Sequence, residues 1–359
     1  MYHIKRTYEN KIPGLREILL PQPCPLYPEA ELAEELNLLG DVPAYLFRDK
    51  QRYAHRLKTY RDILKEVGPD VVHAHWLYQY GLHGVLASRG IAPFVQSVWG
   101  SDVLLIPLFI QESFGLLQYV LSNADMVLGN SRTLINAALG FLDSPPPPSY
   151  LFKWGVEPIF NPALYHRETL REKYGFGQSD VIILSARGFK PVYNIRTVIR
   201  AFEQARQTFP QLRLILLGRG YGWEEYHTKE SPACRVMETG SHELIAELMA
   251  ISEISISIPF SDSMANTLVE SLAMGLYLVA SRLPAAEEYL ENDIQAKLVN
   301  PYEVDEVSAA ICGYFTEPGL HEKMKAAGRS VCREFSEEKA LQDVRQVYET
   351  VRLTPGVRR

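Results

Sequence analysis

The sequence predicts an α/β protein of two domains, each built on a parallel sheet. Short apolar segments of strand length recur along the 359 residues and are separated by stretches of helical length, a rhythm typical of parallel α/β sheets. Four consecutive prolines, Pro145 to Pro148, can form neither helix nor central strand, so they mark a domain boundary. With 47% hydrophobic residues, the chain is long and apolar enough for two cores.

The first domain is expected to cover residues 1–147. Its opening residues offer two short strand candidates joined by a turn at Pro13 and Gly14. A nucleotide-binding half-fold normally opens with an apolar strand and a glycine-rich turn into a helix. The N-terminal domain is therefore expected to lack its first strand or to have an unusual sheet. A polar helix is predicted over residues 48–67, and strands are predicted in "DVVHAHW", which ends near Trp76, in "PFVQSVWGSD" and in "ADMVLGNS".

The second domain is expected to cover residues 148–335, where the rhythm of strands and helices restarts. Strands are predicted in "VIILSAR", "RLILLG", "RVMETG", "ISISIP", "YLVAS" and "AKLVN". Helices are predicted over residues 194–208, 242–250 and 265–275, and Gly275 closes the last one because glycine tolerates positive φ. Residues 336–359 are predicted to form a separate C-terminal helical segment.

Composition excludes several classes of protein. The formal net charge of −6 and the pI near 5.9 argue against a general nucleic-acid binder, whose affinity would depend on a basic surface. The four cysteines have no metal-ligand spacing, which fits a reducing compartment. No apolar run is long enough to span a bilayer and no cleavable signal is visible, so a cytoplasmic location is expected.

One apolar stretch, residues 104–121, is rich in large side chains. It could dock on a membrane or on a lipid-linked acceptor. A buried core helix is favoured, because the polar face of the stretch is thin and has no Lys or Arg.

A polar stripe runs through the segment "SDSMANTLVESLAMG", between two strand candidates. Its members fall at helical spacing and are Ser263, Asn266, Thr267 and Glu270, with Asp262 just before them. In a strand-helix-strand unit such a loop lies at the carboxyl edge of a parallel sheet, where ligands bind, and a helix N-terminus presents N–H groups to an anion. The alternative is an ordinary solvated helix face.

The loop "SARGFKPVYN" places Arg187 and Lys190 after a buried strand, again at the carboxyl edge. Cations there can neutralise a diphosphate leaving group, although ordinary surface charge is the alternative. The sequence contains no DxD triplet, the usual carboxylate pair for a nucleotide-sugar metal. Phosphate charge would then be met by Arg, Lys and helix dipoles.

Two further motifs suggest other enzyme classes. The cluster "GRGYG" follows a strand at Gly218, and Glu238 lies where the ribose-binding acid of an NAD-dependent oxidoreductase would stand. The intervening segment lacks an apolar helical period and contains Pro232, so the glycines are better explained as part of a loop. In "HAHW", His73 and His75 point to one side of a strand and suggest a zinc hydrolase, but no third ligand can be named.

The motif "QSVWGSD" ends a strand with Gly100, Ser101 and Asp102. A small-residue turn with an acid can contact a ligand, and it can equally cap a helix.

Together these segments resemble retaining glycosyltransferases of family four. The similarity covers nearly the whole chain from about residue 66. It is carried most strongly by Asp262 followed by "NTLVESLAMG" with Glu270, and by "PDVVHAHW", "SVWGSD", "ADMVLGNS", "KWGVEPIFNP" and "HELIAELMAISEISISIPFSD" in the expected order. The resemblance implies the GT-B architecture of two facing Rossmann-like domains. It also implies that the terminal helix crosses back to the N-terminal domain.

The resemblance implies roles for the donor residues. Asp262 would approach the hydroxyls of the donor sugar, and Glu270 would accept hydrogen bonds from the ribose. Arg187 would be the cation on the leaving phosphate. Lys190 is a second cation candidate, because Tyr193 stands where many members carry Lys. The other implied donor-binding residues are Ser263, Asn266, Thr267, Leu268 and Gly218.

On the acceptor side the implied residues are His75, Trp99, Gly100 and Asp102, and Trp99 stands where many members have a His. The implied reaction is transfer of a sugar from a nucleoside diphosphate sugar to an acceptor hydroxyl with retention, without a bound metal or other cofactor. The expected acceptor is a glycan or a lipid-linked molecule in surface glycan or polysaccharide synthesis. Peripheral contact with the membrane surface is an additional possibility. A degenerate, non-catalytic sugar-nucleotide-binding protein is the alternative.

Overall fold

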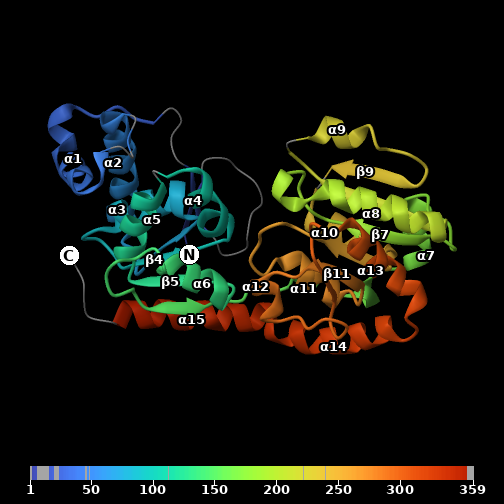
Figure 1. Ribbon diagram of the computed structural model, residues 1–359. Coiled ribbons are helices and arrows are strands. Elements are labelled where there is room, and N and C mark those ends of the chain that lie inside the picture. The colour runs from blue at the N-terminus through green and yellow to red at the C-terminus, as the bar shows by residue number, and fades with distance from the viewer. Residues whose placement is uncertain are drawn as a thin grey trace. The chain divides into compact units, whose positions relative to one another are not determined.

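The computed structural model describes residues 24–44, 47, 49–111, 113–220, 222–238 and 240–353, and the backbone alone of 2–5 and 16–19. The chain divides into two compact units (Figure 1). Unit 1 holds the chain up to Gly129, then Ile135–Tyr150 and Gln346 onward, and unit 2 holds Asn130–Leu134 and Leu151–Arg345. The long stretch of unit 2 therefore begins shortly after the proline run.

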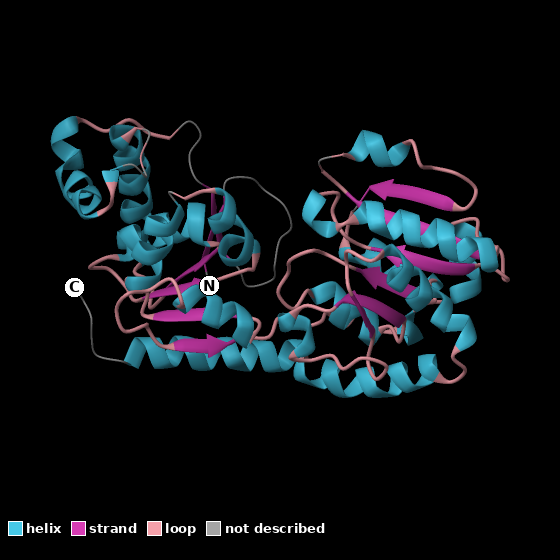
Figure 2. Cartoon of the chain, in the orientation of Figure 1, coloured by secondary structure: helices cyan, strands magenta, loops and turns pink. Residues whose placement is uncertain are grey.

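Unit 2 is built on a six-stranded sheet in the order β12-β11-β10-β7-β8-β9, with every neighbouring pair parallel (Figure 2). The strands are β7 (Val181–Ser185), β8 (Leu212–Gly218), β9 (Cys234–Glu238), β10 (Ile254–Ser257), β11 (Tyr277–Ser281) and β12 (Lys297–Val299). Strand order runs outward from β7 in one direction and from β10 in the other. The switch point, where ligands bind in sheets of this kind, therefore lies between β7 and β10.

Helices cover both faces of this sheet. They are α7 (Arg167–Lys173), α8 (Ile195–Thr208), α9 (Trp223–His227), α10 (His242–Ile251), α11 (Asn266–Ala273), α12 (Pro284–Glu287), α13 (Val304–Thr316) and α14 (Leu320–Glu334). Within β7, Ile183 packs in the core with α8 and α13, whereas Ile182 and Leu184 pack in the core with α10. This alternation, with both faces buried, explains why the strands are apolar runs.

Unit 1 contains a four-stranded sheet in the order β3-β4-β5-β6, in which β3, β4 and β5 are parallel. The strands are β3 (Val72–His75), β4 (Phe94–Ser97), β5 (Met126–Gly129) and β6 (Ser149–Leu151), and the helices are α1 (Ala33–Leu38), α2 (Lys50–Val67), α3 (Leu82–Ser88), α4 (Ile106–Phe109), α5 (Ser113–Ser122) and α6 (Arg132–Leu139). The predicted polar helix and the three predicted strands of this part are confirmed. A π-helical turn follows β3 at Leu77–Gly81, and another follows β4 at Ser101–Leu105.

The two strand candidates at the start of the chain are β1 (Tyr2–Lys5) and β2 (Arg16–Leu19). They pair with each other in parallel, in a separate two-stranded sheet. The turn expected at Pro13 and Gly14 lies outside the described residues.

The C-terminal helix is α15 (Glu337–Leu353), and its residues from Gln346 onward count with unit 1. There the Tyr348 hydroxyl is 2.8 Å from His73 Nδ1. The other ring nitrogen of His73 is 2.8 Å from the Ser97 hydroxyl. The partly buried His73, on β3, thus connects the last helix to β4 of the unit 1 sheet.

The prediction of one buried core helix over residues 104–121 is wrong. The segment is divided among the second π-helical turn, α4 and α5, and Leu108 and Phe109 are 75% and 77% exposed. Only α5 supplies buried leucines and valine to the core. Pro107 lies in the first turn of α4, a position that starts a helix rather than continues one. None of the described helices is long and apolar enough to cross a bilayer.

Candidate functional site

Two loops leave the sheet of unit 2 at the switch point, one after β7 and one after β10. They are tied together, because the Phe260 N–H donates to the Val192 carbonyl at 2.9 Å. Asn194 adopts a left-handed backbone conformation with φ 56°, and its amide donates to the carbonyls of Ile258 at 3.2 Å and Pro301 at 2.7 Å. The loops after β7, β10 and β12 are therefore held as one block.

Arg187, on the loop after β7, reaches the loop after β10. Its guanidinium forms an ion pair with Asp262, donates to the Thr267 hydroxyl at 3.1 Å, and lies over the Tyr193 ring at 4.3 Å from the ring centre. The Arg187 side chain is only 10% exposed. Among the described residues its buried Nε–H has no hydrogen-bond partner, so one donor of this guanidinium is unsatisfied.

A contact between Tyr193 and Arg187 was not predicted. Tyr193 stands where many members of the family that the sequence resembles carry Lys, and in the structure the Arg187 guanidinium packs on its ring. An aromatic residue six positions after an arginine is too weak a pattern to predict this stacking. Lys190, the second cation candidate, is exposed at the start of a short 3₁₀ turn.

Ser263 lies in the loop before α11 and not on the helix, so the predicted stripe is shorter than expected. Its hydroxyl donates to the Asn130 side chain and is 3.0 Å from the Ser131 hydroxyl, and the Asn130 amide donates to the Met264 carbonyl at 2.7 Å. Ser263 therefore anchors the loop that carries Asp262. Asn130 and Ser131 were not predicted as part of this site, because they stand more than 130 residues away in the sequence.

The first turns of α11 present the rest of the stripe. Asn266 is exposed, Thr267 contacts Arg187, Leu268 is buried, and Glu270 is 9% exposed one turn beyond Thr267. Burial raises the pKa of Glu270 to about 7; Glu157 also raises it, and His242 and Arg187 oppose the shift. Gly275 has φ 74° and closes the helix as predicted.

Glu157 and His242 form an ion pair near Glu270, and neither was predicted as a site residue. His242 is the first residue of α10. A lone His or Glu beside a strand-helix junction gives no signal in the sequence, so only the fold could bring these groups together.

Gly218 is the last residue of β8 and lies against the loop that carries Arg187. A Cβ at this position would stand 2.6 Å from the Arg187 carbonyl and 2.6 Å from the Phe189 ring, so the close approach requires glycine. The "GRGYG" loop thus follows β8 rather than β7, which is the strand at the switch point. Glu238 ends β9 beside it and forms an ion pair with Arg219 at 2.9 Å.

The residues predicted for the acceptor side lie at the carboxyl ends of β3 and β4 in unit 1. Asp102 is fully buried and accepts hydrogen bonds from the backbone N–H groups of Leu77 at 3.2 Å, Trp99 at 2.9 Å and Gly100 at 2.9 Å. Burial raises the pKa of Asp102, while these hydrogen bonds oppose the shift. Asp102 therefore braces two loops.

Trp99 is 52% exposed, and its ring packs edge to face with His75 at 5.9 Å. Gly100 has φ 118°, a backbone conformation that glycine adopts readily and other residues rarely adopt. His73 and His75 are adjacent, with ring centres 4.2 Å apart. Since both ring nitrogens of His73 lie within hydrogen-bond distance of hydroxyls, this ring does not present a ligand pair for zinc together with His75. No group of three metal-ligating side chains occurs within the described part of the chain.

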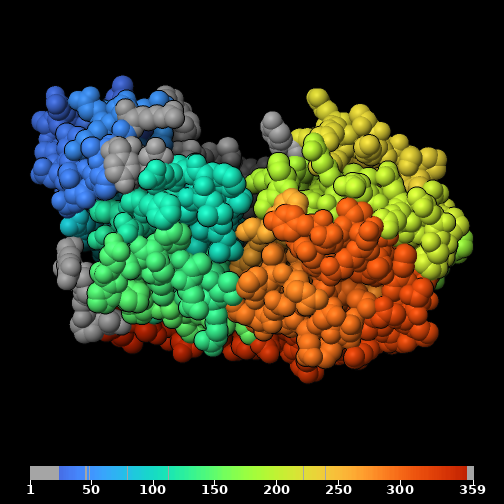
Figure 3. Space-filling view, in the orientation of Figure 1, coloured from blue at the N-terminus to red at the C-terminus, as the bar shows by residue number. Residues whose placement is uncertain are grey.

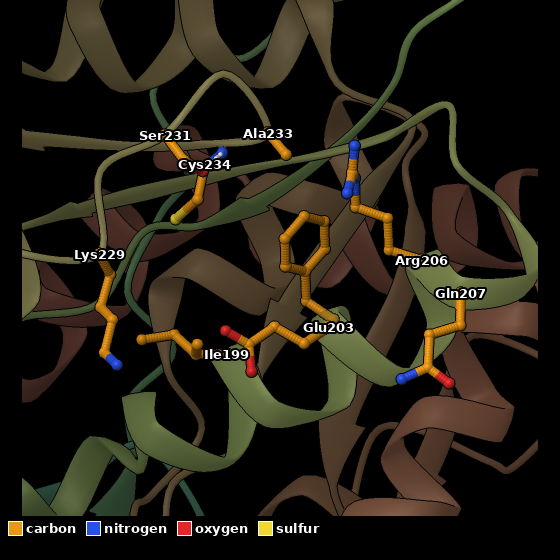
Figure 4. Close-up of a pocket in the computed structure, with 9 residues that line it drawn as sticks. Ile199, Glu203, Arg206, Gln207, Lys229, Ser231, Ala233 and Cys234 are labelled. Carbon is orange, nitrogen blue, oxygen red and sulfur yellow. Dashed lines mark hydrogen bonds between the residues drawn. The ribbon is translucent and has the colours of Figure 1, made fainter.

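A cavity of about 270 Å³ lies elsewhere in unit 2. Its lining comes from α8 and from the segment before β9, which belong to the yellow-green and yellow parts of the chain in Figure 3. Figure 4 shows Glu203, Arg206 and Gln207 on α8, with Lys229 and Cys234 on the other side. These residues stand at the amino end of β9, opposite the edge that carries Arg187 and Asp262.

Two α/β units with parallel sheets, the second with a six-stranded doubly wound sheet, are the architecture of the GT-B glycosyltransferases. The family models agree with this architecture: residues 166–331 match "Glycosyl transferases group 1" and residues 42–131 match "Glycosyl transferase 4-like". Both halves of the chain thus match glycosyltransferase family models.

The relatives are distant in sequence. The chain is 21% identical over 292 residues to N-acetyl-alpha-D-glucosaminyl L-malate synthase of Bacillus anthracis, covering 78% of this chain and 74% of the relative. It is similar in fold to Anabaena HepE solved with UDP and glucose, with a TM-score of 0.68, 18% identity, and coverage of 83% and 82%. It is also similar to sucrose-phosphate synthase of Thermosynechococcus elongatus, with a TM-score of 0.74, 16% identity, and coverage of 96% and 85%.

Proposed function

We propose that this protein transfers a sugar from a nucleoside diphosphate sugar to an acceptor hydroxyl, with retention at the anomeric carbon. The observation that carries the proposal is the Arg187 cluster at the switch point of unit 2. It combines a buried guanidinium, the Asp262 carboxylate, the Thr267 hydroxyl and the N-terminal turn of α11. The nucleotide-bound relative HepE supports a nucleoside diphosphate as the ligand.

The roles follow from the chemistry of each group. The Arg187 guanidinium and the first N–H groups of α11 would face the diphosphate, where negative charge grows as the glycosidic bond breaks. Asp262 accepts hydrogen bonds only and would bind donor-sugar hydroxyls. Glu270 would accept hydrogen bonds from the ribose hydroxyls. Catalysis would rest on alignment of donor and acceptor and on stabilising the leaving group.

A bound metal is not required in this proposal, because Arg187 and the α11 N-terminus provide the positive charge for the phosphates. Nucleotide binding and transfer are expected to be unchanged by EDTA. A loss of binding on chelation, restored by Mg²⁺, would contradict this part of the proposal. Retention is tested separately by NMR of the anomeric proton in the first product formed.

The proposed donor site is tested by thermal unfolding of the full chain with UDP, GDP, ADP and NAD. A ligand at about a hundred times its dissociation constant adds roughly 2.7 kcal/mol to the folded state. One nucleoside diphosphate is expected to raise the melting temperature, and Arg187→Ala is expected to abolish the rise. Stabilisation by NAD alone would support the oxidoreductase alternative instead. No stabilisation by any of the four would refute the donor site.

The second candidate is a sugar-nucleotide-binding protein without turnover. It shares the donor site, so it also predicts stabilisation by one nucleotide. The two are separated by product formation: an enzyme releases the nucleoside diphosphate from its donor when an acceptor is supplied, and a binding protein does not.

We further propose a cytoplasmic role in surface glycan or polysaccharide synthesis. Peripheral membrane contact stays a prediction, and the exposed Leu108 and Phe109 on α4 are the residues to change. Sedimentation of the chain with phospholipid vesicles, compared with the Phe109→Ser variant, checks it.

A further inference from the structure

The loops after β3 and β4 form an aromatic platform, defined as the Trp99 indole with the His75 ring packed against it. Trp99 is 52% exposed although it lies two residues beyond a fully buried strand. The two rings meet edge to face, with centres 5.9 Å apart and an interplanar angle of 82°. About half of this large apolar side chain is therefore accessible to solvent at the carboxyl edge of the sheet, the edge at which parallel sheets bind ligands.

The platform is held rigidly. Asp102 accepts three backbone hydrogen bonds, one from the loop after β3 and two from the loop after β4. Trp76, directly after β3, has φ 77°, a conformation that is strained for a residue other than glycine. It is fixed by hydrogen bonds from its N–H to the Ser97 carbonyl at 3.2 Å and from the Gly81 N–H to its own carbonyl at 2.9 Å. Strain kept in place by such bonds is typical of preorganised ligand sites.

Charge limits what the platform can bind. The two loops, residues 76–81 and 97–103, contain no Lys or Arg, and their one acid, Asp102, is buried. An anionic acceptor such as a hydroxy acid would find no cation on these loops. A neutral ligand with one apolar face and a rim of hydroxyls matches an exposed indole bordered by His75 and the exposed Ser101.

We propose that Trp99 stacks on a pyranose ring of the acceptor, and that the acceptor is consequently a neutral pyranoside. This inference rests on the proposed function, because it names the acceptor of that reaction. The axial C–H groups of one pyranose face would lie on the negative face of the indole. Asp102 would act as a positioning residue, since it contacts the loops and not the sugar.

The test uses the full chain with the nucleoside diphosphate that stabilises it. Methyl pyranosides of glucose, galactose, mannose and N-acetylglucosamine are the probes, with L-malate, glycerol and myo-inositol as non-pyranoside controls. Saturation-transfer NMR is expected to show contact with the protons on one face of a pyranoside. The signal should be lost in Trp99→Ala and kept in Trp99→Tyr, because tyrosine keeps an aromatic face.

Kinetics provide a second readout once a donor is known. Trp99→Ala is expected to raise the acceptor KM about tenfold, the value of one stacked aromatic ring, with a smaller change in kcat. Phe114→Ala is the matched control, since Phe114 is also an exposed aromatic of unit 1 but packs against Phe141. This control should leave both constants at their wild-type values.

The outcomes separate the two proposals. If a nucleoside diphosphate binds but no pyranoside gives a transfer signal, the acceptor inference fails and the proposed function stands. The inference also fails if L-malate or glycerol is the substrate used, or if Trp99→Ala binds pyranosides as well as the wild type. If no nucleoside diphosphate binds, the proposed function fails and the acceptor inference fails with it.

Discussion

Glu270 gives the most quantitative prediction. Its carboxyl group is 9% exposed, and burial raises its pKa from 4.5 to about 7. Because the folded protein binds this proton more tightly than the unfolded chain, the carboxyl group costs no stability below about pH 4.5. The cost grows as the pH rises and is complete above about pH 7. Since one pH unit is worth about 1.4 kcal/mol, the full cost is about 3 kcal/mol.

The variant Glu270→Gln removes the charge and keeps the shape. Its free energy of unfolding is expected to exceed that of the wild type by up to about 3 kcal/mol at pH 8 and to be similar at pH 5. Urea unfolding at pH 5, 6, 7 and 8 measures the free energy of unfolding of the wild type and of the variant. The control is Glu287→Gln, which changes a carboxylate of the same unit that is 45% exposed. A difference between wild type and Glu270→Gln that does not grow with pH would refute the reasoning.

Three further predictions concern single contacts. Arg187→Lys cannot keep the Asp262 and Thr267 contacts together, so nucleotide affinity measured by calorimetry should fall about 10- to 100-fold, and an unchanged affinity would contradict the donor site. Gly218→Ala should destabilise unit 2 by about 2–4 kcal/mol in urea unfolding, because its Cβ would meet the Arg187 carbonyl. Asp102→Asn should lower the stability of unit 1 by about 2–4 kcal/mol, because an amide cannot accept all three backbone N–H groups; an equally stable variant would show that the carboxylate does not brace the loops.

Much of unit 2 could be predicted from the sequence because its signals are local. Apolar runs of strand length separated by amphipathic helices predicted β7 to β12 and the helices α8, α10 and α11, but not the short helices α9 and α12. Because each loop follows a predicted parallel strand, Arg187 and Asp262 were both placed at the carboxyl edge of a sheet before any contact was known, whereas the adjacency of β7 and β10 came only from the structure. The helical spacing from Thr267 to Glu270, closed by Gly275, likewise needed only a few consecutive residues.

The failures concern information that is not local. Apolar composition predicted burial for residues 104–121, yet composition does not say which neighbours are available to cover a side chain, and Leu108 and Phe109 are left exposed. Ser263 was predicted to lie on the polar stripe of the helix because it fell at helical spacing, yet it lies in the loop before α11. Its partner, Asn130, is on a segment far away in the chain, and no periodicity within one helix can reveal such a bond.

The five residues Asn130–Leu134 interrupt unit 1 in sequence but belong to unit 2. Besides the bonds from Asn130 and Ser131, Glu288 accepts the N–H groups of Arg132 at 2.7 Å and Thr133 at 2.6 Å. A gene fragment beginning at Leu151 would therefore encode unit 2 without the residues that anchor its Asp262 loop. An exchange of unit 2 between related proteins would also have to transfer residues 130–134, so this unit is encoded by two separate stretches of the gene.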